Sequence, residues 1–196
     1  MTDLFERADA SADGAFYTFA RKVVHIEAGA IAALRAVYAR ELPPGEPVLD
    51  LMSSWRSHLP EDGLGPVSGL GMNEAEMADN PQLGAYAVHD LNADPVLPHP
   101  DDAFGAAVCA VSVQYLTSPL EVFADLRRVV RPGGPAIVSF SNRCFPTKAV
   151  RAWTLGTDAD HLALVRAYLE GSGFGDVRDE APPTGDDPLF VVWGRA

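Results

Sequence analysis

Near the start of the chain, apolar side chains recur at the spacing of a helix. Between Phe16 and Tyr38 they occupy positions 16, 19, 20, 23, 24, 30, 31, 34, 37 and 38. Intervals of three and four residues place these side chains on one helical face, and the Pro-Pro-Gly at 43–45 stops a helix. The pattern predicts one long amphipathic helix over 16–38.

Beyond this helix, short apolar runs alternate with segments of helical character. The runs that predict strands are 47–51, 67–70, 85–88, 106–116, 136–140 and 190–193. The run 106–116 is apolar almost throughout, which is typical of a parallel strand covered on both faces. The helix-like segments are 73–78, 118–131 and 157–171. Strands that alternate with helices imply right-handed crossovers and predict a doubly wound α/β sandwich.

The last two helices carry signals at their ends. Ser118 is a capping residue, Pro119 suits the first helical position, and Glu121 stands where it closes a capping box. Pro132-Gly133-Gly134 ends that helix. The other helix begins at Thr157 and stops at Gly171.

Composition indicates the number of domains and the sign of the protein's net charge. The chain has 196 residues, of which 47% are hydrophobic, and 27 acidic against 15 basic side chains give a formal net charge of −12. We therefore expect a single domain over residues 1–196. An excess of negative charge repels phosphate backbones and anionic lipids, so we expect neither nucleic acid nor membrane as a partner.

Localisation and metal content follow from a few local features. The N-terminus is polar, no run of about 18 apolar residues occurs, and the two cysteines, Cys109 and Cys144, lack zinc-site spacing. These features favour a cytoplasmic protein. The polar group His89, Asp90, His99, Asp101 and Asp102 lies among prolines at 95, 98 and 100. Those prolines favour an extended loop over a helix face, so we expect no metal site.

Three segments together resemble a known family. They are VLDL at 48–51, HDLNADPVLPHPDDAFGAAVCAVSVQYLTSP at 89–119 and LRRVVRPGGPAIVSFSN at 126–142. Over roughly residues 46–141 the chain resembles the class I S-adenosylmethionine-dependent methyltransferases of the type 11 group. The resemblance is closer to a subgroup with a DLMSSW-type loop. It implies a Rossmann-like core of seven strands over 45–196, a reversed final hairpin, and an N-terminal helical lid over 1–44.

The resemblance also implies where S-adenosylmethionine binds. Asp50 matches the acid that closes the first motif, near the methionine part of the cofactor, with Leu51, Met52 and Ser53 after it. Asp90 matches the acid that receives the adenine amino group, and Leu91 stands beside it. A purely structural role is an alternative for Asp50, because its carboxylate could cap the turn that follows it.

Two departures from the family pattern are visible. Where the family has a glycine-rich loop, this chain has Met52, Ser53, Ser54, Trp55 and Arg56. The family's ribose-binding acid is replaced by Gly71. Asn73 or Glu74 could take over the hydrogen bonds to the ribose diol, and we favour Asn73. We expect Trp55 to be a packing residue.

The acceptor side is predicted from the lid and the strand ends. His25, with Arg21 and Tyr17 one and two turns earlier on the same helix, could line the acceptor pocket, with His25 as a candidate base. Gln114 and Tyr115 end the fourth strand, where family members meet the acceptor. Arg143 would suit an anionic acceptor, but an exposed salt bridge explains it equally well.

These observations lead to two hypotheses. The first is a methyltransferase that uses S-adenosylmethionine and acts on a small-molecule acceptor, since no large inserted domain is present to grip a macromolecule. The alternative is a non-catalytic protein on the same fold that binds another nucleotide or metabolite, or an interaction partner. This alternative is suggested by the absence of the family's loop glycines and of its ribose-binding acid. Acceptor identity, methylated atom and oligomeric state are not encoded in recognisable form.

Overall fold

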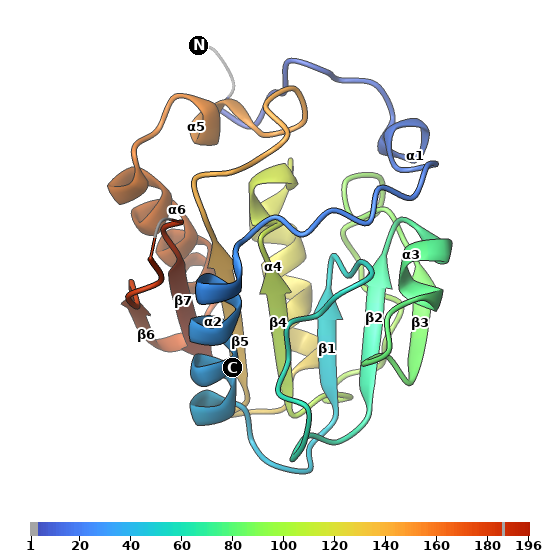
Figure 1. The fold of residues 1–196 in the computed structure, drawn as a ribbon, viewed down its shortest axis with the longest axis vertical. Coiled ribbons are helices and arrows are strands. Elements are labelled where there is room, and N and C mark those ends of the chain that lie inside the picture. The colour runs from blue at the N-terminus through green and yellow to red at the C-terminus, as the bar shows by residue number, and fades with distance from the viewer. Residues whose placement is uncertain (1–3, 186) are drawn as a thin grey trace.

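The computed structural model describes residues 4–185 and 187–196, and its centre is a sheet of seven strands in the order β3-β2-β1-β4-β5-β7-β6 (Figure 1). The strands are β1 Val48–Leu51, β2 Val67–Gly71, β3 Ala85–Val88, β4 Ala106–Ala110, β5 Pro135–Phe140, β6 Gly175–Glu180 and β7 Phe190–Arg195. The pairs among β1 to β5 are parallel, whereas β7 runs antiparallel to both β5 and β6. The predicted doubly wound sandwich with a reversed final hairpin is confirmed.

Helices cover both faces of this sheet. They are α1 Asp13–Phe16, α2 Ala28–Glu41, α3 Glu74–Ala78, α4 Pro119–Val129, α5 Arg151–Thr154 and α6 Asp158–Gly171, with a 3-10 turn η1 at Val113–Tyr115. Leu34 and Tyr38 of α2 belong to one buried cluster, and Phe123 of α4 and Val165 of α6 belong to the other. The two clusters form the layers on either side of the sheet, with α2 in front in Figure 1.

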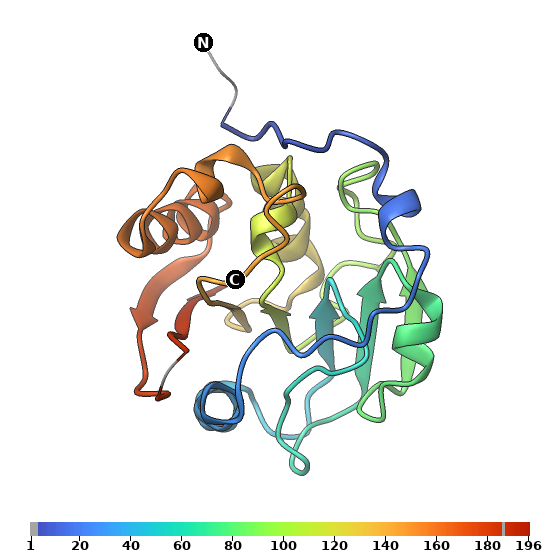
Figure 2. The ribbon, with the colours of Figure 1, turned by 45° about the horizontal axis from the view of Figure 1, so that its top comes forward.

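The predicted helix over 16–38 is wrong in its first half. The structure has α1 at Asp13–Phe16, an irregular non-helical segment over residues 17–27, and then α2 from Ala28 to Glu41. We call residues 17–27 the strap, because they cross the upper ends of β2 and β1 between α1 and α2 (Figure 2). The predicted helical lid is therefore helical in α1 and α2 but not in the strap between them, and residues 1–3 of it lie outside the described part of the chain.

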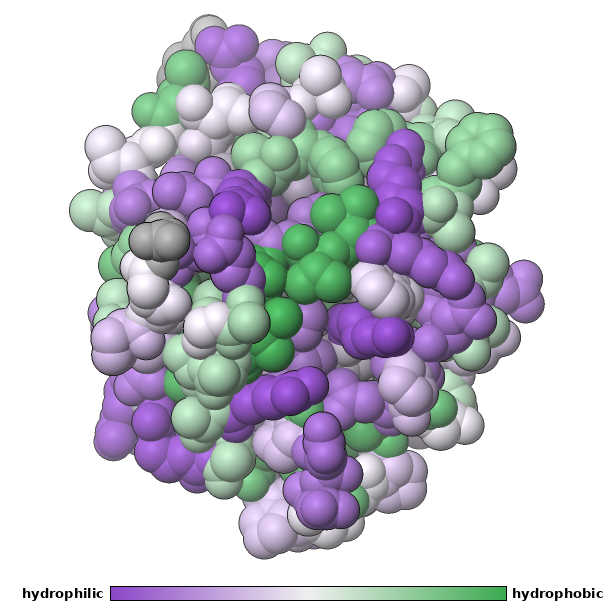
Figure 3. Space-filling view, in the orientation of Figure 1, coloured by the Kyte–Doolittle hydropathy of each residue, from purple (hydrophilic) through white to green (hydrophobic). Residues whose placement is uncertain are grey.

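The exposure of apolar side chains on the strap explains why their spacing wrongly predicted a helix. Val23 and Val24 remain 43% and 41% exposed, and Phe19 is 75% exposed, so they do not form a buried helical face. Apolar side chains gather in the middle of this side of the molecule, where the strap crosses the sheet (Figure 3).

The connection between β1 and β2 is irregular. Parallel strands are usually joined by a crossover helix, but residues 52–66, all of them described, form no helix. Buried polar side chains hold this crossover instead. Asn80 donates to the carbonyl of Ser54 at 2.8 Å and to Ser57 Oγ at 2.9 Å, and Gln82 donates to the carbonyl of Leu59 at 2.9 Å.

Three other predictions needed correction. The strand predicted over 106–116 ends at Ala110, and the chain then turns through η1, so Gln114 and Tyr115 lie on a turn. Ser118 is the N-cap of α4 but makes no side-chain capping bond, whereas Thr157 and Asp160 of α6 form a complete capping box. Strand β6 was not predicted, because its sequence GDVRDE is mostly charged and exposed.

A buried charge cluster fixes the N-terminal segment to the sheet. Lys148 is fully buried, and its Nζ lies 3.2 Å from carboxylate oxygens of Asp9 and of Asp13 and 2.8 Å from the carbonyl of Ser11. Asp13 also accepts hydrogen bonds from Arg7 at 2.7 Å. The cluster therefore attaches the chain before the strap to the loop that follows β5.

Among the described residues, no helix is long and apolar enough to cross a bilayer.

Candidate functional site

A cavity lies where the parallel strands end at the switch in strand order. Chain order runs outward from β1 to β3 and then returns to β4 on the other side of β1, and ligands of such sheets bind at this point. The cavity holds about 1160 Å³ of empty space, counting its open mouth.

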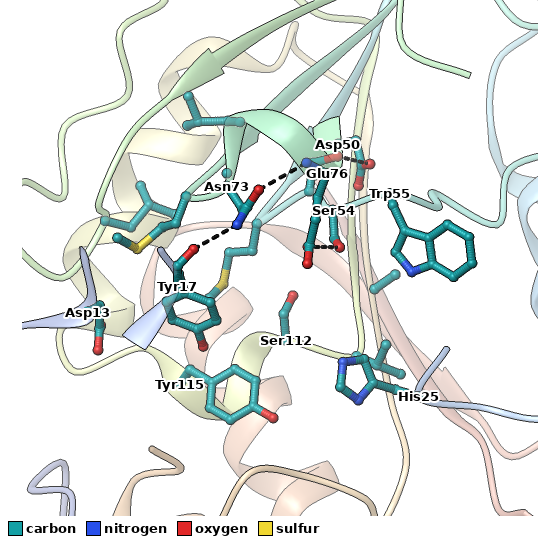
Figure 4. A pocket seen from close by; sticks show the side chains of 18 of the residues that line it. Asp13, Tyr17, His25, Asp50, Ser54, Trp55, Asn73, Glu76, Ser112 and Tyr115 are labelled. Carbon is teal, nitrogen blue, oxygen red and sulfur yellow. Dashed lines mark hydrogen bonds between the residues drawn. The ribbon is translucent and has the colours of Figure 1, made fainter. Parts of the chain in front are cut away.

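The strap closes one side of the cavity and is tied to it by hydrogen bonds. Asn73 Nδ2 donates to the carbonyl of Tyr17 at 2.8 Å, and Trp55 Nε1 donates to the carbonyl of Val23 at 2.9 Å. The backbone N–H of Arg21 donates to Glu76 Oε1 at 2.6 Å. These core partners all come from the segments that follow β1 and β2, as Figure 4 shows for Asn73, Glu76 and Trp55.

Asp50 ends β1 as a buried carboxylate. Its Oδ2 accepts hydrogen bonds from Ser53 Oγ and from Ser57 Oγ, both at 2.6 Å. Burial raises the pKa of Asp50 to about 6, although the two serine hydroxyls lower it. The turn after this strand begins at Met52, whose φ of 57° lies in the left-handed region that favours glycine. Asp50 therefore lines the cavity and also organises the irregular crossover.

Gly71 has no room for a side chain. A Cβ at this position would lie 2.2 Å from the carbonyl oxygen of Ser53, because the crossover folds over the end of β2. Asn73 caps α3 by accepting from the N–H of Glu76 and holds the strap with its amide group. Both functional groups of Asn73 are thus engaged, and Glu74 is exposed outside the cavity.

Glu76, which the sequence did not single out, is the acid that faces the cavity from this side. Besides the bond from Arg21 N, its carboxylate accepts from Ser54 Oγ at 2.5 Å and from Lys22 N at 3.3 Å (Figure 4). The signal that could have found it is the spacing of Glu76 from β2, one turn into the helix that follows the strand.

Asp90 follows β3 and keeps one oxygen available. Its Oδ1 accepts from the backbone N–H groups of Asn92 and Ala93, while Oδ2 has no hydrogen-bond partner within the described ranges. Leu91 lies beside it in the cavity lining. This arrangement offers a fixed carboxylate oxygen and an apolar neighbour to a ligand.

Aromatic side chains form the side of the cavity opposite Asp50 and Glu76. Tyr115 and His25 lie there together with Ser112, and Tyr17 projects from the start of the strap (Figure 4). Burial lowers the pKa of His25, opposed by the charge of Glu76, and raises the pKa of Tyr115 to about 12. At neutral pH the imidazole is neutral and the phenol keeps its proton.

The structure brings most of the predicted site residues to this cavity. The lining includes Tyr17, Arg21, His25, Asp50, Met52, Ser53, Asn73, Asp90, Leu91 and Tyr115. Three do not line it. Leu51 and Gln114 are buried in the sheet layers, and Arg143 forms ion pairs with Glu27 at 3.1 Å and Asp187 at 2.6 Å. The salt-bridge interpretation of Arg143 therefore holds.

Other lining residues were missed or read differently. Trp55 was expected to pack, and it does anchor the strap, but its ring also borders the cavity. His58 and Phe145 were not singled out at all. Phe145 stands in the loop after β5, where only the proximity of Tyr115 and His25 in space identifies it. Within the described ranges, no group of three or more His, Cys, Asp or Glu residues could hold a metal ion.

Comparison with known family models gives a match over part of the chain. A family model described as a methyltransferase domain matches residues 67–138, from β2 through β5. The irregular crossover and Asp50 lie outside the matched part. No curated protein sequence gave a significant match.

Solved structures share the fold at low sequence identity. The structure resembles a putative methyltransferase from Haloferax volcanii, determined in complex with the methyltransferase activator Trm112 (15% identity, 83% of this chain and 87% of that chain, TM-score 0.65). It also resembles an S-adenosylmethionine-dependent methyltransferase from Mesorhizobium loti (20% identity, 86% and 98%, TM-score 0.60). A third similar structure is phosphoethanolamine N-methyltransferase 2 from Haemonchus contortus in complex with S-adenosyl-L-methionine (12%, 83% and 52%, TM-score 0.60).

Proposed function

We propose that this protein is an S-adenosylmethionine-dependent methyltransferase that acts on a small-molecule acceptor. The observation that carries the proposal is the large cavity at the switch point of a methyltransferase-type sheet, with carboxylates at the ends of β1 and β3. S-adenosylmethionine supplies an electrophilic methyl group, and the protein has to hold an acceptor atom in line with it.

In this proposal the cofactor lies along the strand ends. The free Oδ2 of Asp90 accepts the adenine amino group, and Leu91 packs against the ring. Asp50, Met52 and Ser53 border the methionine end. Above its pKa of about 6 the Asp50 carboxyl group is ionised, which suits the ammonium group of the methionine end.

Glu76 is proposed to bind the ribose. The usual position of the ribose acid, Gly71, cannot carry a side chain, and both groups of Asn73 are engaged. Glu76 Oε1 holds two strap N–H groups, so ribose hydroxyls compete with or extend this set of hydrogen bonds. Cofactor and strap would then share one carboxylate.

The acceptor is proposed to bind under the strap, against Tyr17, Arg21, His25 and Tyr115. A small acceptor fits because the strap leaves a cavity rather than an open groove. We also propose that residues 1–196 act as a single domain, since one sheet carries every element that lines the site.

Titration calorimetry tests the cofactor assignment. We expect S-adenosylhomocysteine and S-adenosylmethionine to bind the wild-type protein at micromolar concentration. Asp90→Asn keeps the turn-forming Oδ1 but removes the charge, and it should weaken both about tenfold or more, the scale of a charge-assisted hydrogen bond. The matched control is Asp94→Asn, in the same loop but outside the cavity.

Unchanged affinity in Asp90→Asn would contradict the assignment of Asp90. No binding of either compound at millimolar concentration, by a protein that unfolds cooperatively, would favour the non-catalytic alternative.

A second pair of variants tests Glu76. Glu76→Gln should weaken S-adenosylhomocysteine binding, with little loss for a 2′,3′-dideoxyribose analogue, because the analogue lacks the hydroxyls that the carboxylate accepts. Glu74→Gln, two residues away on the exposed side of α3, should leave both affinities unchanged. Equal weakening of the two ligands by Glu76→Gln would assign Glu76 to the strap alone.

A further inference from the structure

Resting on the proposed function, we propose that the acceptor is a flat aromatic molecule that carries no positive charge and whose reacting group is an acidic hydroxyl, of the phenol or enol class. It would bind against an aromatic wall, which we define as Tyr17, His25, Tyr115 and Phe145. His25 would receive the proton of the hydroxyl.

The aromatic wall is assembled from separate segments around Phe145. The ring centroid of Phe145 lies 5.3 Å from that of His25, at an interplanar angle of 88°, and 6.1 Å from that of Tyr115, at 30°. Phe16 supports Phe145 from behind at 5.5 Å and packs edge-on to Tyr17 at 5.0 Å. Offset and edge-to-face contacts of this kind are the favoured ones for a further ring.

Hydrogen bonding fixes the orientation of the wall. The backbone N–H of Phe145 donates to the Tyr115 hydroxyl oxygen at 2.9 Å, which ties the loop after β5 to the turn after β4. A preorganised apolar surface is useful only to a ligand with a matching flat face. The wall therefore favours an aromatic ring over a flexible aliphatic chain.

Positive acceptors find no free counter-charge at the wall. Asp13, whose charge acts on Tyr17, is already bound by Arg7, Asn92 and Lys148. Glu76, whose charge acts on His25, already accepts three hydrogen bonds. The remaining lining carboxylates belong to Asp50 and Asp90, on the proposed cofactor side. A cationic amine would thus lose its hydration without a free carboxylate in exchange.

Two arginines also border the cavity. The guanidinium of Arg21 lies 4.2 Å from the centroid of the Phe16 ring and donates to the carbonyl of Phe16 at 2.7 Å. The guanidinium of Arg56 stacks on Trp55 at 4.0 Å and donates to the carbonyl of Trp55 at 2.6 Å. Neither guanidinium forms an ion pair among the described residues, so the positive charge of the two arginines further opposes a cationic acceptor.

His25 is placed to act as the base. In the described parts of the chain, neither of its ring nitrogens has a hydrogen-bond partner, and the ring borders the cavity beside Tyr115 and Ser112 (Figure 4). The titratable groups that face it are Glu76 from α3 and His58 from the crossover. Burial keeps His25 neutral at pH 7 but lowers its basicity, which matches it to an acidic hydroxyl rather than to an aliphatic alcohol.

The step balances with these groups. The acceptor oxygen forms a bond to the methyl carbon as its proton passes to a ring nitrogen of His25. The bond between that carbon and the sulfonium sulfur breaks, and its electron pair stays on sulfur. The products are a neutral methyl ether, S-adenosylhomocysteine and protonated His25, which then releases its proton to water.

Matched probe molecules test the recognition of the ring. With saturating S-adenosylhomocysteine, and again without it, binding of 2-naphthol and of the saturated decahydro-2-naphthol is measured by saturation-transfer NMR and calorimetry. We expect the wild-type protein to prefer 2-naphthol about tenfold, as two aromatic contacts allow. Phe145→Leu should abolish the preference while S-adenosylhomocysteine still binds. Phe19→Leu, on the strap but 75% exposed, should retain it.

Charge selection is tested with 2-(aminomethyl)naphthalene, which is cationic at pH 7. Binding as tight as that of 2-naphthol would overturn the exclusion of cationic acceptors, and equal binding of the two naphthols would overturn the aromatic wall. If S-adenosylhomocysteine does not bind, the proposed function fails, but the naphthol comparison without it still decides the aromatic site.

Turnover tests His25. Incubation with S-adenosylmethionine and 2-naphthol should give 2-methoxynaphthalene, and His25→Gln should lower kcat about 100-fold. In the wild type, kcat/KM should fall as pH drops and His25 gains a proton, and this fall should disappear in His25→Gln. A bound 2-naphthol that is not methylated, or an unchanged pH profile in the variant, would contradict the assignment of His25.

Discussion

Asp50 shows how one residue can serve both the fold and the site. The side chain is 2% exposed, and both hydrogen bonds to its Oδ2 come from the irregular crossover. The unfolded chain ionises this group near pH 3.8, whereas the folded chain does so near pH 6. Between these values the folded state holds a proton that the unfolded state has lost, so stability falls as pH rises through this window.

Asp50→Asn should remove this contribution. We expect the free energy of unfolding of the wild type to fall by up to ~3 kcal/mol more between pH 4 and pH 7 than that of the variant, from a pKa difference of about two units. Urea denaturation at both pH values measures the difference. Asp62→Asn, an exposed acid of the same crossover, is the control, and parallel pH profiles for wild type and Asp50→Asn would refute the expectation.

For single residues, the sequence predicted which side chains lie at the cavity better than it predicted what those side chains bind. The strand-end rule brought Asp50 and Asp90 to the cavity, because a residue that follows a parallel strand must stand at that edge. For the ribose we propose Glu76 in place of the predicted Asn73, because Asn73 caps α3 and a capping role and a ligand role have the same sequence signature. The place of Glu76, one turn into the helix after β2, could have been read from the sequence, whereas the place of Phe145 depends on the path of the loop after β5, which no local pattern encodes.

Among the elements, the strap is where local propensity and tertiary structure disagree. The spacing of apolar residues predicted a helix through residues 17–27, but the backbone groups of this segment bond to Asn73, Glu76 and Trp55 instead. Side chains far along the chain thus replace helical hydrogen bonds. The strands and the helices α4 and α6 were predictable because their burial pattern is set by the sheet they cover.

Lys148→Met tests the attachment of the segment before the strap. Methionine keeps the apolar contacts of the buried stem but removes the charge between Asp9 and Asp13, of which Asp13 retains Arg7 and Asn92. We expect a loss of about 1–3 kcal/mol in the free energy of unfolding, less than for a buried ion left without any partner.

Residues 4–16 should also become accessible to limited proteolysis before the sheet unfolds. Lys22→Met is the control, because it breaks an exposed ion pair with Asp79 and should cost less than about 1 kcal/mol. Equal effects of the two substitutions would show that the buried cluster does not fix the segment.

For the whole molecule, the alternation of strands and helices was sufficient to predict the sandwich. The final antiparallel pair came from the family resemblance, because the exposed and charged β6 gives no apolar signal. No sequence pattern predicted the irregular crossover, because its polar network joins residues that lie before and after β2 in the chain. Ser57 donates to Asp50, and Asn80 donates to Ser57.

Net charge also acts on the whole molecule. With a formal charge of −12, self-repulsion should oppose the compact state, and salt screens it. Raising sodium chloride from 20 to 500 mM should therefore increase Tm by about 2–4 °C, which corresponds to roughly 1 kcal/mol. Differential scanning calorimetry measures it, and a lower Tm at high salt would mean that the surface ion pairs outweigh the repulsion.

The missing crossover helix has a consequence for how this site can evolve. A helix N-terminus attracts ligands through backbone groups that every sequence shares, and single substitutions alter it little. Here the serines and the arginine of residues 53–56 occupy that place. Ligand recognition at this end of the sheet therefore depends on individual side chains. Small mutational steps can then retune, exchange or abolish recognition at this edge while the sheet beneath stays unchanged.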